Sequence, residues 1–193
     1  LFFSYAYNSL GTGTGALILF GAVQTTMIVS GWISGERMTH LRFAGIFLAV
    51  SGLIYLVFPG LSAPSPLGAF LMTISGIAWG IYSLLGRQSA DPVSTTAFNF
   101  ICSIPIVLGA GFFISAPVSI TDEGLMAAIL SGTLASGTGY VIWYAALKGL
   151  SATRAAVVQL IVPVIAAFGG LFFLSETFSV RLMIASFIIL SGV

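Results

Sequence analysis

Two segments decide the fold of this chain: residues 1–53 read LFFSYAYNSLGTGTGALILFGAVQTTMIVSGWISGERMTHLRFAGIFLAVSGL, and residues 141–193 read VIWYAALKGLSATRAAVVQLIVPVIAAFGGLFFLSETFSVRLMIASFIILSGV. Both segments have the same pattern of apolar and polar residues. The segments align without a gap after a shift of 140 residues. Few residues are identical, but Glu36 meets Glu176 and Gly52 meets Gly192. Each segment consists of an apolar span, a short polar joint with one glutamate, and a second apolar span. The chain therefore carries a repeated element.

The composition places this chain in a lipid bilayer. Charged residues make up 6% of the chain and hydrophobic residues 58%, whereas charged residues make up about 25% of soluble domains. The mean hydropathy is +1.12. We therefore expect an all-α, multi-pass helical membrane protein. The chain has no cluster of basic residues that could bind nucleic acid. The single cysteine, Cys102, excludes an internal disulfide and a cysteine metal site.

Long apolar stretches predict where the chain crosses the membrane, since a helix needs about 20 apolar residues to span the hydrocarbon. The predicted spans are 13–33, 41–58, 67–87, 95–116, 125–147 and 154–174, with partial spans at 1–10 and 180–193. The joints between them are short, so successive helices run antiparallel. One side of the membrane then carries Arg37, His40, Arg42, Arg87, Lys148 and Arg154, and the other carries Asp122, Glu123, Glu176 and Arg181. The side rich in Lys and Arg is predicted to be cytoplasmic.

The span order predicts that the two copies of the repeat are inverted. The chain crosses the membrane an odd number of times between the span at 13–33 and the span at 154–174. A duplicated and inverted unit of about five helices is typical of secondary transporters. We therefore expect about ten helices in the parent protein, with part of them preceding residue 1.

Polar and aromatic side chains inside the spans are the candidate solute-binding residues, because such groups are costly in lipid and usually face protein or a cavity. They are Gln24, Trp79, Tyr82, Asn99, Tyr140 and Gln159. The aromatic side chains offer stacking surface and hydrogen-bonding tips, and the amides can recognise polar groups. Pro163 is predicted to free the carbonyl of Gln159 from its helical hydrogen bond.

Other features have structural interpretations. Trp143 and Tyr144 lie near a helix end and are expected in the interfacial aromatic belt. The pairs Gly76-x3-Gly80 and Gly132-x3-Ser136 are expected to let helices approach closely. Glu36 and Glu176 each precede a span and are expected to cap a helix N-terminus. The run Gly11-x-Gly13-x-Gly15 lacks the strand and lysine of a phosphate loop, so no nucleotide, other cofactor or metal is expected.

Several of these stretches together resemble the EamA family of the drug/metabolite transporter superfamily. They are residues 15–24 with Gly35-Glu36, residues 72–87 (MTISGIAWGIYSLLGR), residues 136–144, and residues 152–163 with Ser175-Glu176. The resemblance implies a ten-helix permease with two inverted five-helix repeats. Residues 1–60 would be the end of the first repeat (part of helix 3, then helices 4 and 5). Residues 67–193 would be the second repeat (helices 6 to 10, the last incomplete).

The resemblance implies export of small metabolites or amino acids across the bacterial inner membrane, through a cavity between the repeats. The expected partners are a small-molecule metabolite and the lipid bilayer, with a homodimer as an open alternative. Two rival functions remain at this stage. One is a channel-like or scaffold protein without active transport, and the other is an intramembrane enzyme. The second rival is disfavoured because no Asp or Glu lies within a span and the chain has one His.

Overall fold

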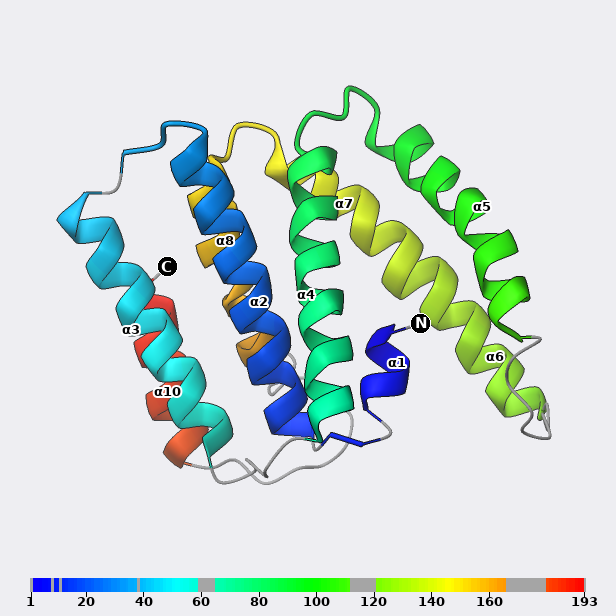
Figure 1. The fold of residues 1–193 in the computed structure, drawn as a ribbon, viewed down its shortest axis with the longest axis horizontal. Helices are drawn as coiled ribbons and strands as arrows, with labels where there is room; N and C mark the ends of the chain where they lie inside the picture. The colour runs from blue at the N-terminus through cyan, green and yellow to red at the C-terminus, as the bar shows by residue number, and fades with distance from the viewer. Residues whose placement is uncertain are drawn as a thin grey trace. The chain divides into compact units, whose positions relative to one another are not determined.

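The structure is a computed structural model that describes residues 2–7, 9–10, 12–37, 39–58, 65–111, 121–165 and 180–192, and these residues form helices and short connections without any strand. The helices are α1 (Phe2–Ala6), α2 (Thr12–Ile33), α3 (His40–Val57), α4 (Pro66–Gly86), α5 (Pro92–Gly111), α6 (Asp122–Leu130), the π-helix η2 (Ser131–Thr138), α7 (Gly139–Leu147), α8 (Ala152–Gln159) and α10 (Val180–Gly192). Within the described residues, an all-α bundle is therefore confirmed (Figure 1).

The described helices match the predicted spans closely at their starts. The stretches long and apolar enough to cross a membrane are Thr14–Ile33, Pro66–Gly86, Pro92–Gly111 and Asp122–Leu147 in the part that the structure describes. Thr39, Thr121 and Ser151 each have an extended backbone, and each side chain accepts a hydrogen bond from the N–H three residues later. Polar joints thus end one span and cap the next helix.

The described chain divides into two compact units. The first unit comprises Leu1–Tyr82 with Ser151–Val193, and the second comprises Ser83–Leu150. Most of α4 belongs to the first unit, and its last turn belongs to the second.

In the first unit, α2 lies beside α8 and α3 lies beside α10 (Figure 1). Both pairs are antiparallel. At α3 and α10, the backbone carbonyl of Tyr55 accepts a hydrogen bond from the Arg181 side chain, whereas near the other end Gly45 approaches Gly192. A Cβ added at Gly45 would lie 2.7 Å from the Gly192 carbonyl oxygen. The two helices thus pack backbone to backbone, as small residues permit in membranes.

The contacts between α3 and α10 are reciprocal under the sequence repeat. A Cβ added at Gly52 would lie 2.8 Å from the Ile189 side chain, and one added at Gly192 would lie 2.6 Å from the Ala49 nitrogen. The shift of 140 residues converts Gly52 into Gly192 and Ala49 into Ile189, so each contact is the image of the other. Inverted copies packed around a pseudo-two-fold axis produce this relationship.

One buried core cluster of the first unit also combines residues of the two copies. Its members are Ala49, Leu53, Leu160, Val164 and Ile189, with Phe20 among the half-buried side chains packed against them. Phe20 and Leu160 are also equivalent under the shift. The centre of this unit is therefore built from matching positions of the two copies.

Helix α4 packs on α2 through the small residues that the sequence singled out. A Cβ added at Gly76 would lie 2.6 Å from the Leu19 carbonyl oxygen, and one at Gly80 would lie 2.9 Å from the Thr26 side chain. The prediction of close packing is thus confirmed for this pair. For Gly132 the described residues show no such approach, because a Cβ added there would meet no described atom within 4 Å. Gly132 instead lies within the π-helix η2.

In the second unit, Tyr144 is buried rather than part of an interfacial belt. The Tyr144 side chain is 1% exposed, and a methyl group at Gly86 would overlap its ring. The Trp143 indole N–H donates a hydrogen bond to the Ser83 hydroxyl at 3.0 Å. The belt prediction is therefore wrong for Tyr144, because a glycine on α4 leaves space for its ring. Trp143 and Tyr144 instead join α7 to the last turn of α4.

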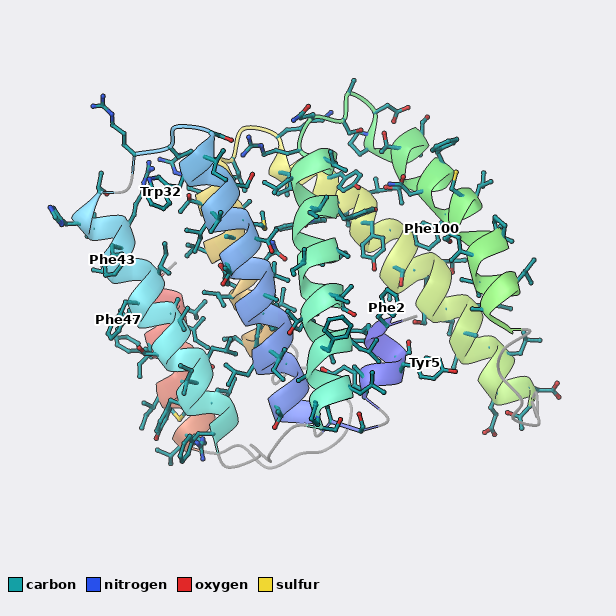
Figure 2. The ribbon with its side chains drawn as sticks, viewed as in Figure 1. Phe2, Tyr5, Trp32, Phe43, Phe47 and Phe100 are labelled. Carbon is teal, nitrogen blue, oxygen red and sulfur yellow. The ribbon has the colours of Figure 1, made fainter. Side chains whose placement is uncertain are left out.

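Large apolar side chains cover much of the helix surface. Trp32 at the end of α2 and Phe43 and Phe47 on α3 are 73%, 66% and 68% exposed (Figure 2). Exposed apolar side chains at this density are expected where a helix faces lipid or another helix rather than water. The Thr25, Thr26 and Thr73 hydroxyls each donate to the carbonyl four residues earlier. These three hydroxyls therefore need no water.

Candidate functional site

A chain of hydrogen bonds links the intramembrane polar side chains of the first unit. The Trp79 indole N–H on α4 donates to Gln159 Oε1 on α8 at 2.6 Å. Gln159 Nε2 in turn donates to the Met27 sulfur on α2 at 3.0 Å. Gln159 is 3% exposed and Met27 is fully buried. One amide thus connects three helices, because its oxygen and its nitrogen bind different neighbours.

Gln24 lies one turn before Met27 on α2 and binds the same helix as Gln159 does. Its Nε2 donates to the Ala156 carbonyl oxygen at 2.6 Å. Gln24 is 5% exposed, and its Oε1 has no hydrogen-bond partner among the described residues. Gln24 also lines a groove of about 360 Å³ between α2 and α3, where most other lining residues are apolar. A buried acceptor without a partner is costly, so this oxygen is suited to receive a donor.

Tyr82 completes the cluster on α4. Its ring stacks on the Trp79 indole with 5.5 Å between ring centroids and 20° between planes. The structure therefore brings together Gln24, Trp79, Tyr82 and Gln159, four of the predicted site residues, within one unit. We call these four residues together with Met27 the amide cluster.

The position of Gln159 follows from a break in its helix. Helix α8 ends at Gln159, Leu160 adopts a turn, and helical structure resumes to residue 165. The break lies within one turn of Pro163, whose ring is incompatible with the carbonyl four residues earlier. This break was not predicted, because the span at 154–174 was expected to be one helix. Broken helices at membrane depth are characteristic of transporter binding sites.

The remaining predicted site residues, Asn99 and Tyr140, lie in the second unit. The Asn99 side-chain amide donates to the Tyr144 hydroxyl at 3.4 Å. The Tyr140 ring packs against Phe100 with 5.8 Å between centroids. In this unit, a polar contact and an aromatic contact thus link α5 to α7. Their role in binding stays a prediction.

Glu36 caps a helix, but not the helix that follows it. The predicted capping role is confirmed, since Glu36 Oε1 accepts from the Ala152 N–H at 2.6 Å and Oε2 from the Thr153 N–H at 3.1 Å. These amides begin α8, whereas α3 is capped by Thr39. Gly35, with φ +83°, allows the tight turn before the glutamate. The equivalent Glu176 lies outside the described residues.

The cap affects the ionisation of Glu36. Partial burial raises the pKa of this carboxyl, but hydrogen bonds from Thr153, Ala152 and Ser151 favour the carboxylate and outweigh burial. The net result is a lowered pKa. Glu36 is therefore a carboxylate at neutral pH and complements the positive end of α8.

Charged side chains lie at the ends of the described helices, not at the amide cluster. Within the described residues, no group of three or more His, Cys, Asp or Glu side chains could hold a metal ion. The amide cluster can therefore recognise a solute by uncharged hydrogen bonds and aromatic stacking. Met27 was not predicted, since a methionine in an apolar span carries no signal that distinguishes it from a core residue.

Comparison with known proteins agrees with this architecture. The sequence profile of the EamA-like transporter family matches residues 66–193. An uncharacterized protein of Pseudomonas aeruginosa is 46% identical over 99% of this chain and 67% of its own length. An uncharacterized transporter of Archaeoglobus fulgidus is 30% identical over 98% of this chain and 70% of its own length.

A more distant relative and a solved structure extend the comparison. A probable amino-acid metabolite efflux pump of Salmonella typhimurium is 23% identical over 93% of this chain and 65% of its own length. A solved crystal structure has the same fold, with a TM-score of 0.83 over 99% of this chain and 69% of that chain, at 18% identity. The chain belongs to the EamA-like transporter family of multi-pass membrane proteins.

Proposed function

We propose that this protein is a secondary transporter that exports small polar metabolites, amino acids among them, by alternating access between two inverted repeats. The amide cluster would bind the solute in the first unit, and Asn99 and Tyr140 are the proposed solute-binding residues of the second unit. The Trp79–Gln159 hydrogen bond is the observation that carries the proposal, because it holds an amide and an indole together on two helices of an apolar bundle. The efflux function named for a relative in Salmonella typhimurium supports the same solute class.

The chemistry of the cluster favours solutes without a net charge. Gln24 Oε1 offers an acceptor, Gln159 Nε2 offers a donor, and the Trp79 and Tyr82 rings offer stacking surface. An ion in the membrane interior needs a counter-charge, and the cluster has none. A zwitterion carries both a donor and an acceptor and is neutral overall. An amino acid with an apolar side chain therefore fits the groups present.

The same proposal includes an orientation and a location. The joint before α3 and the start of α8 lie at one end of the first unit, where Arg37 and Arg154 occur. In the second unit, Lys148 donates to the Ala90 carbonyl oxygen, close in sequence to Arg87. We assign these basic ends to the cytoplasm of a bacterial cell, by the positive-inside rule. Assembly as a homodimer is part of the proposal and is tested by the oligomeric state in detergent.

An efflux assay tests the proposed function. The complete protein is expressed in bacteria, and efflux of a panel of labelled amino acids is followed. Saturable efflux of one class is expected. Gln159→Ala and Trp79→Phe should raise KM about tenfold, the effect of losing about 1.4 kcal/mol of binding. Trp32→Phe is the matched control, because Trp32 is 73% exposed at the end of α2.

Each outcome of the efflux assay has a defined meaning. Flux that does not saturate indicates a channel rather than a transporter. Absence of efflux, with the protein verified in the membrane, contradicts export of the tested class and favours a scaffold. Saturable efflux that Gln159→Ala leaves unchanged would show that the solute binds outside the amide cluster.

A further inference from the structure

The Gln159 side chain has two unequal hydrogen-bond partners. Its Oε1 accepts from the Trp79 indole N–H at 2.6 Å, and an amide oxygen is a good acceptor for such a donor. Its Nε2 donates to the Met27 sulfur at 3.0 Å. A thioether sulfur is a weak acceptor. The oxygen of Gln159 is therefore firmly engaged, whereas its nitrogen is bound to a partner that a solute oxygen could replace.

The surroundings of Met27 make this contact specific. Met27 is fully buried and lies one turn from Gln24 on α2, while Gln159 lies one turn from Ala156 on α8. Gln24 Nε2 binds the Ala156 carbonyl oxygen, so α2 and α8 are held in fixed register here. A leucine at position 27 would fill a similar volume without offering any acceptor. Met27 therefore contributes an interaction that packing alone does not require.

We infer that Met27 sets the affinity of the proposed site, because its sulfur competes for the Gln159 amide nitrogen with a solute that brings a carboxylate or carbonyl oxygen. The inference rests on the proposed function. A solute oxygen exchanges a weak N–H···S bond for a stronger N–H···O bond, so binding is favourable for oxygen-bearing solutes. A solute that carries only donors cannot make this exchange and leaves Gln159 bound to Met27. Met27 should therefore weaken the binding of amino acids and leave unchanged the binding of amines that lack the carboxylate.

The test compares an amino acid with the matching amine, which lacks the carboxylate and therefore carries a net positive charge. The first is the amino acid of the efflux panel that saturates, and the second is the matching amine; for L-phenylalanine this is 2-phenylethylamine. KM and the maximal rate of efflux are measured for both in the wild type and in Met27→Leu. Met27→Leu should lower KM for the amino acid about two- to tenfold, since no competing bond must be broken. KM for the amine should stay unchanged.

Two matched variants keep the test interpretable. Met72→Leu removes another fully buried methionine, which packs against Ala6 and Leu10 in a separate apolar cluster, and it should change neither KM. In a Gln159→Leu background, Met27→Leu should no longer affect the amino acid, because the donor is absent. Exchanges of methionine for leucine conserve volume and usually cost less than about 1.5 kcal/mol. The Met27→Leu and Met72→Leu proteins should therefore fold.

The outcomes separate this inference from the proposed function. A raised KM for the amino acid, or an equal change for both solutes, would overturn the role of Met27 while leaving transport intact. If no member of the panel gives saturable efflux in the wild type, the proposed function fails and the inference fails with it.

Discussion

Glu36 Oε1 accepts a hydrogen bond from the Ala152 N–H at 2.6 Å, although 116 residues separate the two positions. The bond ties the joint after α2 to the first turn of α8. Gly31 makes the approach possible, because a Cβ there would lie 2.9 Å from the Thr153 hydroxyl and 3.0 Å from the Glu36 carboxylate. The two helices that carry Gln24 and Gln159 are thus joined at one end by a single carboxylate.

Replacement of this carboxylate should destabilise the first unit. Glu36→Gln retains one acceptor oxygen but places an NH₂ group near the donor N–H groups of α8. The expected cost is about 1 kcal/mol, typical of a lost helix cap, which lowers the unfolding temperature by about 2–4 °C in a protein of this size. Thermal unfolding in detergent, followed by circular dichroism, measures it. Glu123→Gln is the control, because Glu123 is exposed in the first turn of α6; an equal loss in both variants would contradict the cap.

The stabilisation by Glu36 should depend on pH in a defined direction. The pKa of Glu36 is lowered in the folded protein, so the folded state favours the carboxylate more than the unfolded state does. The contribution is complete above the usual glutamate pKa of about 4.3 and is lost as pH falls through the lower folded value. The difference in unfolding temperature between wild type and Glu36→Gln should therefore be constant from pH 8 to 6 and shrink below pH 4.5. A difference that grows on acidification would show the opposite shift.

Most of the fold could be predicted because a membrane helix is specified by the apolar residues of its own segment. The spans at 13–33, 41–58 and 67–87 each differ by one residue from the start of a described helix. An effect of Pro163 on the Gln159 carbonyl was predicted, since a proline acts on its own helix, whereas the break at Leu160 was not. The π-helix at Ser131–Thr138 was missed, because its small and polar residues fit an ordinary α-helix equally well.

The contacts between side chains of different helices could not be predicted with the same success. Spacing showed that Gln24 and Gln159 lie inside spans, but not that Met27 binds Gln159. The position of Glu36 before a span indicated that it caps a helix, but suggested that this helix is α3, which follows it, and not α8. Tyr144 was expected at the membrane interface because the sequence does not show that Gly86 leaves space for its ring. Each of these facts depends on which helices become neighbours, and that is decided by the whole fold.

The close approach of α3 and α10 should make Gly45 intolerant of a side chain. Gly45→Ala places a methyl group against the Gly192 carbonyl oxygen, which is backbone and cannot rotate away. We expect a loss of about 1–3 kcal/mol from overpacking. Gly109→Ala is the matched control inside α5, where a Cβ meets nothing described within 4 Å, and it should stabilise the helix by up to about 1 kcal/mol. Equal effects in the two variants would show that α3 and α10 do not pack this closely.

The proposed orientation can be tested by cysteine labelling in spheroplasts. Cys102 is exposed, so every labelling variant also carries the substitution Cys102→Ala. A membrane-impermeant maleimide should label Glu123→Cys in intact spheroplasts, and should label Arg37→Cys only after permeabilisation. Both positions lie in or next to polar joints of the described chain, so neither cysteine should disturb a span. The reverse pattern would place the basic ends outside the cell and contradict the assignment.

The contact between Gly86 and Tyr144 should appear as coupling in a double-mutant cycle. Gly86→Ala introduces a methyl group that overlaps the buried Tyr144 ring, so α7 must shift away from α4. A loss of about 2 kcal/mol is expected in the wild-type background. In a Tyr144→Ala background the ring is absent, so the same substitution should cost little and the two changes should be strongly non-additive. Thermal unfolding of the four proteins gives the coupling energy. Additive losses would mean that Tyr144 does not occupy the space above Gly86, and the packing of α7 on the last turn of α4 would have to be revised.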